Sequence, residues 1–343
     1  MDHVYSRGLK VARMAPPTGK KVAVIGAGAA GLSCAGALAG FGHSVTIFEK
    51  RELGGGLSTY GIVTLREPVE IALAEVDLIR DMGVEFKTDA EFGQDLKLSE
   101  LQANFGAVFL GVGLGSTPKM GIGGEEHVID GLQYIEQSKV DRSRLNIGRN
   151  VIVIGAGNTA IDCATIAKRL GAERVTIVYR RSEREMSAYE HEYEFIKKEG
   201  VEFRFQTQPT RVMVDNGHVT GIECVRMALG EPDTSGGASP QAVAGSEFTL
   251  PADQVVKAIG QEKPGPAGFL DLSMEKGKIK VNGEFETNIH GVYAGGDCIR
   301  AQGACSTVMA VQDGKLAAQC IHRRLMETLA HAARSEANGR SQN

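Results

Sequence analysis

The sequence predicts an α/β fold that contains two strand–turn–helix–strand units of one design, each with a glycine-rich turn. In the first unit, a short apolar strand over residues 20–25 leads into a glycine-rich turn at 26–31. A helix of small residues is expected over 32–41 and a second strand over 44–48. This order of elements is typical of a Rossmann-type dinucleotide-binding unit.

The second unit repeats the pattern in the middle of the chain. An apolar strand over residues 150–154 leads into Gly155-Ala-Gly157-Asn158-Thr159-Ala160. A helix is expected over 160–170 and a strand over 174–179. Two units of this kind predict two bound nucleotides with different roles.

The spacing of the first turn matches its expected chemistry. Gly26 permits the tight turn, Gly28 lets a pyrophosphate approach the backbone, and Gly31 lets the helix pack closely on the strand. The first amides of the helix and its dipole then hold the phosphates. Glu49 follows the second strand, where a carboxylate can accept a hydrogen bond from a ribose hydroxyl.

The second unit differs at the position equivalent to Glu49, where the chain has Arg180 and Arg181. A carboxylate there would repel a 2′-phosphate, whereas guanidinium groups can bind it in bidentate fashion. The pair therefore favours NADP(H) over NAD(H). The alternative is that both arginines are only solvated side chains at the end of a strand.

A third motif near the end of the chain suits FAD in the first unit. A strand over residues 291–294 meets the turn Gly295-Gly296-Asp297, and Asp297 can bind a hydroxyl of the flavin side chain. A last helix is expected over 307–329. The positive end of its dipole can stabilise negative charge on the reduced flavin ring.

Composition excludes several other classes of protein. The chain has 343 residues, enough for about two domains, and a net charge of -4, which invites neither nucleic acid nor an anionic membrane. The uncharged run over 22–48 is rich in Gly and Ala, so we expect it inside a globular domain and not in a membrane. The first 20 residues contain no signal peptide, and the six cysteines have no metal-site or C-x-x-C spacing. We therefore expect a cytoplasmic protein with reduced thiols and no metal site.

The chain resembles the flavin (small, or β) subunit of bacterial glutamate synthase, and it is almost as similar to the flavin modules of dihydropyrimidine dehydrogenases. The resemblance covers nearly the whole chain. It rests on residues 26–31 with Glu49, 55–57, 60–62, Arg66, 155–160, 179–181, Met186, 199–203, 225–226, 230–233, 243–247, 258–260, 294–297 and 311–314.

The resemblance implies a glutathione-reductase-like pair of Rossmann-type domains, with the NAD(P)H domain inserted into the FAD domain. After a linker at 1–20, the FAD domain would comprise 21–117 and 261–343, and the NAD(P)H domain 118–260. The implied FAD contacts are Gly26, Gly28, Ala30, Gly31, Glu49, Lys50, Gly55, Gly56, Leu57, Ile62, Arg66, Gly113, Gly296, Asp297, Thr307 and Val308. The implied NADPH contacts are Gly155, Gly157, Asn158, Thr159, Arg180, Arg181, Ala258 and Gly260.

The implied activity is that of an FAD-dependent NADPH oxidoreductase. NADPH would give a hydride to FAD, and the electrons would pass to a separate acceptor, an iron–sulfur protein or a larger subunit. Hydride transfer between stacked rings needs no protein acid or base, so no catalytic residue is assigned. The chain departs from the family in two ways: its first 33 residues contain no Cys for iron–sulfur clusters, and Val63 replaces the usual proline.

Other functions are less well supported by the sequence. Thioredoxin reductase needs a redox C-x-x-C, which is absent here. Slow reaction of a flavin with O₂, as in an oxidase or monooxygenase, is compatible with the motifs. Two further alternatives are the flavin subunit of an NAD(P)H-dependent pyrimidine reductase and a non-catalytic flavin-binding subunit of a larger complex.

Overall fold

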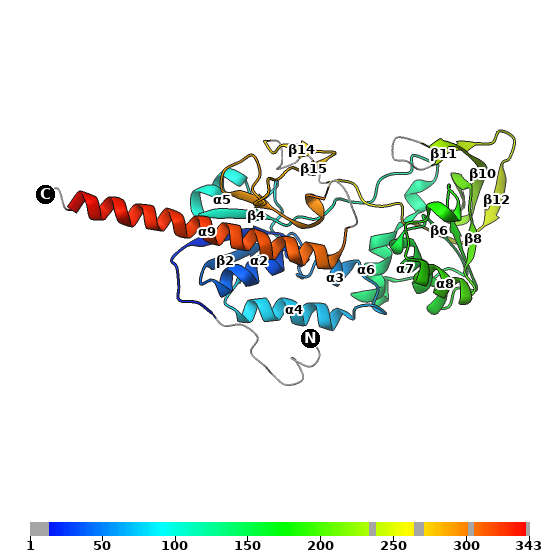
Figure 1. Cartoon of the computed structure of the whole chain (residues 1–343). Coiled ribbons are helices and arrows are strands. Elements are labelled where there is room, and N and C mark those ends of the chain that lie inside the picture. Colours follow the sequence, from blue (N-terminus) through cyan, green and yellow to red (C-terminus); the bar gives the residue numbers. More distant parts are fainter. Residues whose placement is uncertain (1–13, 233–237, 264–270, 301–304, 341–343) are drawn as a thin grey trace. The chain divides into compact units, whose positions relative to one another are not determined.

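The computed structural model describes residues 14–232, 238–263, 271–300 and 305–340 (Figure 1). The chain divides into two compact units. Unit 1 comprises Met1–Thr59, Glu70–Gly115 and Lys263–Asn343, and unit 2 comprises Tyr60–Val69 and Ser116–Glu262. The short segment 60–69, which was expected in the FAD domain, groups with unit 2. Residues 1–13 of the expected linker lie outside the described ranges.

Unit 1 is built on a five-stranded parallel sheet. Its strand order is β16-β4-β1-β2-β3, with β1 at Lys21–Ile25, β2 at Ser44–Phe48, β3 at Glu85–Lys87, β4 at Ala107–Leu110 and β16 at Val292–Ala294. Because the order reverses at β1, a crevice is expected beyond the carboxyl ends of β1 and β4.

Both faces of this sheet are covered. One apolar core joins the sheet to helices α2 (Ala29–Gly40) and α9 (Thr307–Arg340), with Ile79 of α4 (Val69–Asp81) at its edge. The core on the other face includes residues of α5 (Leu98–Asn104) and of β15 (Lys278–Ile279), which pairs with β14 (Met274–Glu275). A one-turn helix, α3 (Leu57–Tyr60), follows a glycine-rich loop.

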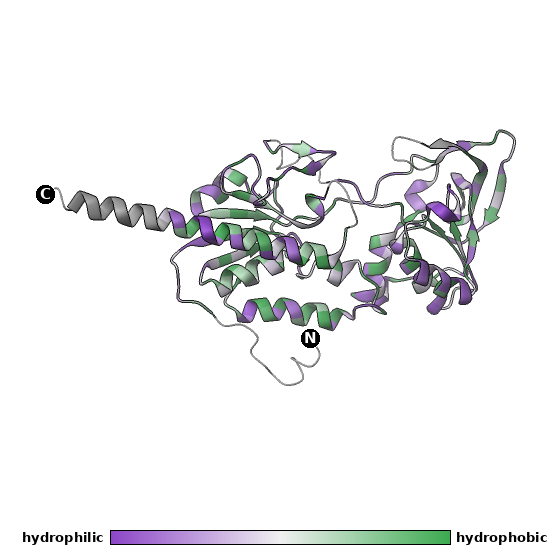
Figure 2. Ribbon diagram, in the orientation of Figure 1, coloured by the Kyte–Doolittle hydropathy of each residue, from purple (hydrophilic) through white to green (hydrophobic). Residues whose placement is uncertain are grey.

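Helix α9 extends beyond the expected end at 329 and continues to Arg340 (Figure 1). It packs closely on α2, because a Cβ added at Gly314 would lie 2.2 Å from the carbonyl oxygen of Ala30. Ser33 of α2 also donates a hydrogen bond of 2.8 Å to the carbonyl oxygen of Val311. In Figure 2, α2 is largely green, which agrees with its position between the sheet and α9.

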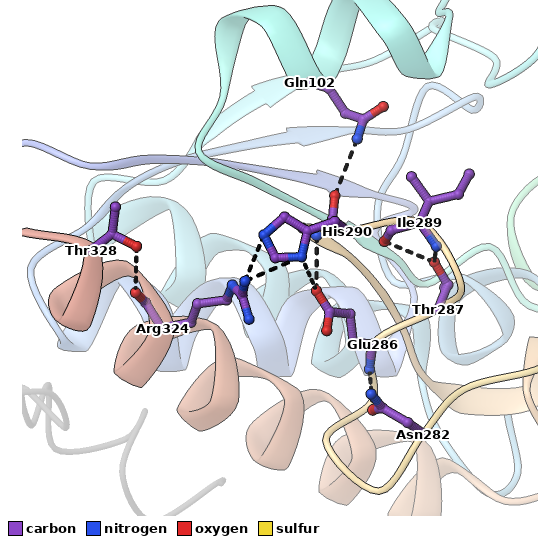
Figure 3. Close-up of polar contacts among 9 residues, drawn as sticks. Gln102, Asn282, Glu286, Thr287, Ile289, His290, Arg324 and Thr328 are labelled. Carbon is purple, nitrogen blue, oxygen red and sulfur yellow. Dashed lines mark hydrogen bonds and ion pairs between the residues drawn. The ribbon is translucent and has the colours of Figure 1, made fainter.

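A polar network ties α9 to the loop before β16 (Figure 3). Arg324 donates to Nε2 of His290 at 2.6 Å, and Nδ1 of His290 lies 3.2 Å from Oε1 of Glu286. The side-chain amide of Gln102, from α5, donates to the carbonyl oxygen of His290 at 3.2 Å. This loop is therefore fixed from both sides of the sheet.

Unit 2 repeats the same plan. Its parallel sheet has the order β5-β13-β6-β7-β8, with β5 at Ile129–Asp130, β6 at Asn150–Ile154, β7 at Arg174–Val178, β8 at Glu202–Arg204 and β13 at Gln254–Lys257. The order reverses at β6, which is the strand before the second glycine-rich turn.

One face of this sheet packs on helices, and the other packs on a second sheet. The helices are α6 (Gly131–Lys139), α7 (Asn158–Arg169) and α8 (Glu190–Lys198). The second sheet is antiparallel and consists of β9 (Thr207–Asp215), β10 (His218–Pro232), β11 (Ala238–Ala242) and β12 (Phe248–Pro251). Helix α8 is largely purple in Figure 2, because most of its residues are hydrophilic, and it buries only Tyr193 and Ile196. Of the helices in the described ranges, none is both long and apolar enough to cross a membrane.

A histidine pair, of which His43 is buried and His322 partly buried, joins three parts of unit 1. Nδ1 of His43 lies 2.7 Å from the hydroxyl of Thr18, and Nε2 of His43 lies 2.9 Å from Nδ1 of His322 on α9. His43 is 5% exposed. Burial, together with the positive charges of His322 and Lys20, lowers the pKa of His43 to about 4.

This lowered pKa predicts acid sensitivity. In the unfolded chain His43 regains a pKa near 6.5 and binds a proton that the folded protein excludes. Its contribution is complete above pH 6.5 and is lost as the pH falls towards 4, with an upper limit of about 3 kcal/mol. Urea unfolding at several pH values should show that the free energy of unfolding depends less on pH in His43→Gln than in the wild type. His191 is exposed, so His191→Gln should show the same pH dependence as the wild type. If His43→Gln also showed the wild-type pH dependence, His43 would not be the source of the acid sensitivity.

Candidate dinucleotide sites

The turn after β1 can be formed only by glycine at two positions. Gly26 has φ +94°, and a Cβ added there would lie 2.5 Å from the carbonyl oxygen of Gly111. A Cβ at Gly31 would lie 1.8 Å from the carbonyl oxygen of Gly26. The obstacle in each case is backbone, which cannot move away as a flexible side chain can. These two glycines are therefore required by the fold itself.

Gly28 is different, because its missing side chain leaves open space. A Cβ added there would have the Cα of Gly56, 3.9 Å away, as its nearest neighbour. Gly56, with φ +56°, faces Gly28 from the loop before α3, and Gly55 N–H fixes that loop by donating to the carbonyl oxygen of Ala27 at 2.8 Å. Gly28 is the N-cap of α2 and supplies no capping side chain. The result is a cradle of bare backbone at a helix N-terminus, which fits the pyrophosphate of a dinucleotide.

Glu49 has a role that the sequence did not reveal. Its carboxylate is buried, and Oε2 accepts a 2.7 Å hydrogen bond from the backbone N–H of Ala27. Oε1 accepts from the backbone N–H of Arg51 at 3.0 Å. Each oxygen keeps further acceptor capacity, so a ribose hydroxyl can still bind. Glu49 thus also braces the glycine-rich turn.

The late Gly-Gly-Asp motif lies against the same cradle. Gly295 N–H donates to the carbonyl oxygen of Leu110, and a Cβ at Gly296, with φ +81°, would lie 2.9 Å from the Cβ of Ala30 on α2. Burial raises the pKa of the Asp297 carboxyl, although Cys305, Lys278 and Arg300 act to lower it. The structure therefore brings this motif together with the first glycine-rich turn.

Most of the other expected FAD residues also lie in unit 1. Val308, next to Thr307 in the first turn of α9, is 77% exposed, and Leu57 of α3 is 42% exposed. Gly113, with φ +66°, follows β4, and Lys50 follows β2 as an exposed residue. Unit 1 thus contains fourteen of the expected residues, all in turns, loops or helix starts that follow its parallel strands. They are Gly26, Gly28, Ala30, Gly31, Glu49, Lys50, Gly55, Gly56, Leu57, Gly113, Gly296, Asp297, Thr307 and Val308.

Ile62 and Arg66 are not grouped with that set, because both belong to unit 2. The Ile62 carbonyl oxygen accepts from Nζ of Lys139 at 3.0 Å. Arg66 lies 2.8 Å from Oδ1 of Asp162 and 2.7 Å from Oε2 of Glu192. Burial raises the pKa of Asp162 to about 7; Arg66 opposes this shift and Glu192 adds to it. A contact of Ile62 or Arg66 with flavin remains a prediction.

The turn after β6 forms a second cradle. Gly155 has φ +127°, and a Cβ there would lie 2.2 Å from the carbonyl oxygen of Ala258. Gly157 is the N-cap of α7 without a capping side chain, and a Cβ there would meet only the hydroxyl of Ser187 at 3.2 Å. Asn158 Oδ1 accepts from the backbone N–H of Tyr189 at 3.1 Å, so this residue also has a structural role.

The remaining residues expected at NADPH surround this turn. Ala258 N–H donates to the carbonyl oxygen of Ile154 at 2.7 Å, which places Ala258 and Gly260 just beyond β13, the strand beside β6. Thr159 lies in the first turn of α7. The cradle in unit 2 thus has the same backbone design as the cradle in unit 1.

Arginines gather at the carboxyl ends of β7 and β8. Arg180 is exposed and Arg181 is partly buried, directly after β7. Backbone hydrogen bonds continue past both strands, from Tyr179 N–H to Arg204 and from Gln206 N–H to Arg181. Arg204 ends β8 beside this pair and is not among the residues expected from the sequence. The order of the parallel strands would have been needed to find it.

Within the described residues, no group of His, Cys, Asp or Glu side chains could hold a metal ion. Cys34, Cys163, Cys224 and Cys298 are buried free thiols, whereas Cys320 is partly exposed and Cys305 is exposed. Burial raises the pKa of Cys298 to about 12, so this thiol is not a reactive nucleophile.

Comparison with known proteins agrees with this geometry. Residues 20–334 match the model of the pyridine nucleotide-disulphide oxidoreductases. The chain belongs to this family. The match confirms the predicted class of oxidoreductase.

Relatives in the pyridine nucleotide-disulphide oxidoreductase family confirm the resemblance to glutamate synthase. The chain is 42% identical to the NADP(+)-dependent formate dehydrogenase subunit beta of Moorella thermoacetica, over 90% of this chain and 44% of the relative. It is 39% identical to the NADPH-Fe(3+) oxidoreductase subunit beta of Geobacter sulfurreducens, over 94% of this chain and 52% of the relative. It is 35% identical to the glutamate synthase [NADPH] small chain of Escherichia coli, over 89% of this chain and 68% of the relative. The chain spans about half the length of the first two relatives.

Solved structures confirm the predicted α/β fold. FprA from Mycobacterium tuberculosis has a TM-score of 0.74 at 18% identity, over 93% of this chain and 86% of FprA. Thioredoxin reductase from T. acidophilum has a TM-score of 0.71 at 22% identity, over 90% of this chain and 99% of the thioredoxin reductase chain. At these identities the similarity concerns the fold alone.

Proposed function

We propose that the chain is an FAD-dependent NADPH oxidoreductase that passes electrons to a separate acceptor. FAD occupies the cradle of unit 1, and NADPH occupies the cradle of unit 2. The observation that carries this proposal is the opposite charge at equivalent places in the two cradles. Glu49 follows β2 and braces the first turn, whereas Arg180 and Arg181 follow β7, the equivalent strand of unit 2. A carboxylate suits a ribose hydroxyl, and two guanidinium groups suit a 2′-phosphate.

The residues of both cradles fit the proposed cofactors. At Gly28 the space that a side chain would fill is open, and at Gly157 only the Ser187 hydroxyl, 3.2 Å from an added Cβ, approaches that space. Each of the two glycines is the N-cap of a helix and supplies no capping side chain. Bound FAD would supply the chemistry, because flavins accept a hydride and release electrons singly. The protein binds and orients the two dinucleotides, and no side chain is assigned as acid or base.

The acceptor is proposed to be an iron–sulfur protein or a larger subunit. The relatives in formate dehydrogenase, NADPH-Fe(3+) oxidoreductase and glutamate synthase are all named as subunits or chains of NADP(H)-dependent enzymes, which supports a partner. A cytoplasmic location is proposed with it and is compatible with the six free thiols. The alternatives are the flavin subunit of a pyrimidine reductase and a non-catalytic flavin-binding subunit.

An anaerobic titration of the flavin-loaded protein with NADPH, and separately with NADH, tests the first half-reaction. Bleaching of the long-wavelength flavin band is expected with both nucleotides, at a lower concentration of NADPH because of Arg180 and Arg181. A spectrum that neither nucleotide changes would reject the oxidoreductase proposal and favour a non-catalytic flavin-binding subunit.

A further inference from the structure

Arg300 and Asp313 form an ion pair beside the Gly-Gly-Asp turn of unit 1. Arg300 follows the 3-10 helix Gly296–Cys298, and Asp313 lies on α9. The guanidinium contacts Oδ2 of Asp313, and the two side chains are only 17% and 10% exposed. The same carboxylate oxygen accepts the backbone N–H of Gly296 at 3.1 Å. Asp313 therefore holds both the turn and the cation.

The guanidinium of Arg300 is incompletely satisfied. Its Nε is buried and has no hydrogen-bond partner among the residues that the structure describes. Buried polar groups in native proteins almost always have a partner, and an orphaned N–H of a charged group is costly. Asp313 engages only the outer part of the guanidinium fork, through NH2. A bound ligand that offers a hydrogen-bond acceptor would complete it.

The surroundings of Arg300 identify which ligand can supply that acceptor. Arg300 acts electrostatically on Asp297, the residue expected at the flavin side chain. Gly296, which Asp313 holds, approaches Ala30 in the first turn of α2, next to the Gly28 cradle. Arg300 thus stands at the place in unit 1 where the dinucleotide is proposed to lie, and it is a cation with an unused donor.

We propose that Arg300 donates its Nε–H to a negatively charged acceptor of bound FAD, with Asp313 as the positioning residue. This inference rests on the proposed function of unit 1. The acceptor is either a pyrophosphate oxygen or the pyrimidine edge of the reduced flavin ring, both of which carry the negative charge that a guanidinium recognises. A contact with the phosphate strengthens binding of both redox states equally, whereas a contact with the ring favours the reduced state.

The first test is FAD affinity of the apoprotein, measured by quenching of flavin fluorescence. If the acceptor is the pyrophosphate, Arg300→Gln should weaken binding of oxidised FAD at least about tenfold, and Arg300→Lys should recover only part of it, because lysine keeps the charge and lacks the fork. The double variant Arg300→Gln/Asp313→Asn leaves no unpaired buried carboxylate and should bind FAD as weakly as Arg300→Gln. Arg323 lies on α9, as Asp313 does, and forms an exposed ion pair with Glu284. Arg323→Gln removes that pair and should bind FAD normally.

The second test separates the two acceptors. The midpoint potential of the bound flavin should fall in Arg300→Gln if the contact is with the ring, and should stay unchanged if the contact is with the pyrophosphate. Binding of 2′,5′-ADP to unit 2, together with the thermal melting of each apoprotein, reports whether the variants are folded. Wild-type affinity and potential in both Arg300→Gln and the double variant would overturn the inference and leave the proposed function intact. A wild-type apoprotein that binds no FAD would overturn both.

Discussion

Alanine at position 31 should destabilise unit 1 strongly, whereas alanine at position 28 should leave the fold intact and weaken FAD binding. In Gly31→Ala the new Cβ would lie 1.8 Å from a backbone oxygen, so α2 and the turn at Gly26 must move apart. We expect a loss of about 3 kcal/mol or more in the free energy of unfolding. In Gly28→Ala the new Cβ would have no atom closer than 3.9 Å, but it would occupy the space proposed for the pyrophosphate.

Thermal melting of the apoproteins and FAD titration distinguish the two effects. Gly28→Ala should melt near the wild-type temperature and bind FAD at least about tenfold more weakly. Unit 2 offers an internal repeat of the experiment. Gly155→Ala should be the destabilising change, because its Cβ would lie 2.2 Å from the carbonyl oxygen of Ala258. Gly157→Ala should impair mainly NADPH binding, because its Cβ would meet only the Ser187 hydroxyl, a side-chain group that can rotate, at 3.2 Å. If Gly28→Ala bound FAD normally, the proposed position of the pyrophosphate would be wrong.

Replacing Arg180 and Arg181 together with alanine should raise the KM for NADPH far more than the KM for NADH. The loss of charge-assisted contacts with a 2′-phosphate costs about 1.5–3 kcal/mol, which corresponds to a change of roughly 10- to 150-fold. NADH has no 2′-phosphate, so its KM should change little.

Steady-state reduction of a dye acceptor by each nucleotide provides the measurement. Arg174→Ala is a matched control, because Arg174 begins the same strand and pairs with Glu202 instead. Equal increases in both KM values would refute the assignment of Arg180 and Arg181 as the phosphate clamp.

The local features of both cradles could be predicted because they depend on neighbouring residues. The strands expected at 44–48 and 150–154 have those bounds in the structure, and both glycine-rich turns precede helices. Such features follow from apolar runs interrupted by glycines, which a sequence displays directly.

Features that depend on distant residues could not be predicted. The bond from Ala27 N–H to Glu49 requires the geometry of the folded turn, and the partners of Arg66 lie on α7 and α8, far along the chain. The orphaned Nε of Arg300 depends on α9 packing against the turn at Gly296. The extra length of α9 beyond 329 was missed because the small polar residues there look like a frayed end.

The division of the chain limits how this protein can be taken apart or recombined. Unit 2 consists of two separate stretches, Tyr60–Val69 and Ser116–Glu262. The first stretch contributes Val63 to the apolar core, and it brings Arg66 between Asp162 and Glu192. A fragment cut at 116–262 would lose that cation and leave two carboxylates side by side. A chimera that exchanges the nucleotide specificity of two relatives must therefore transplant both stretches together.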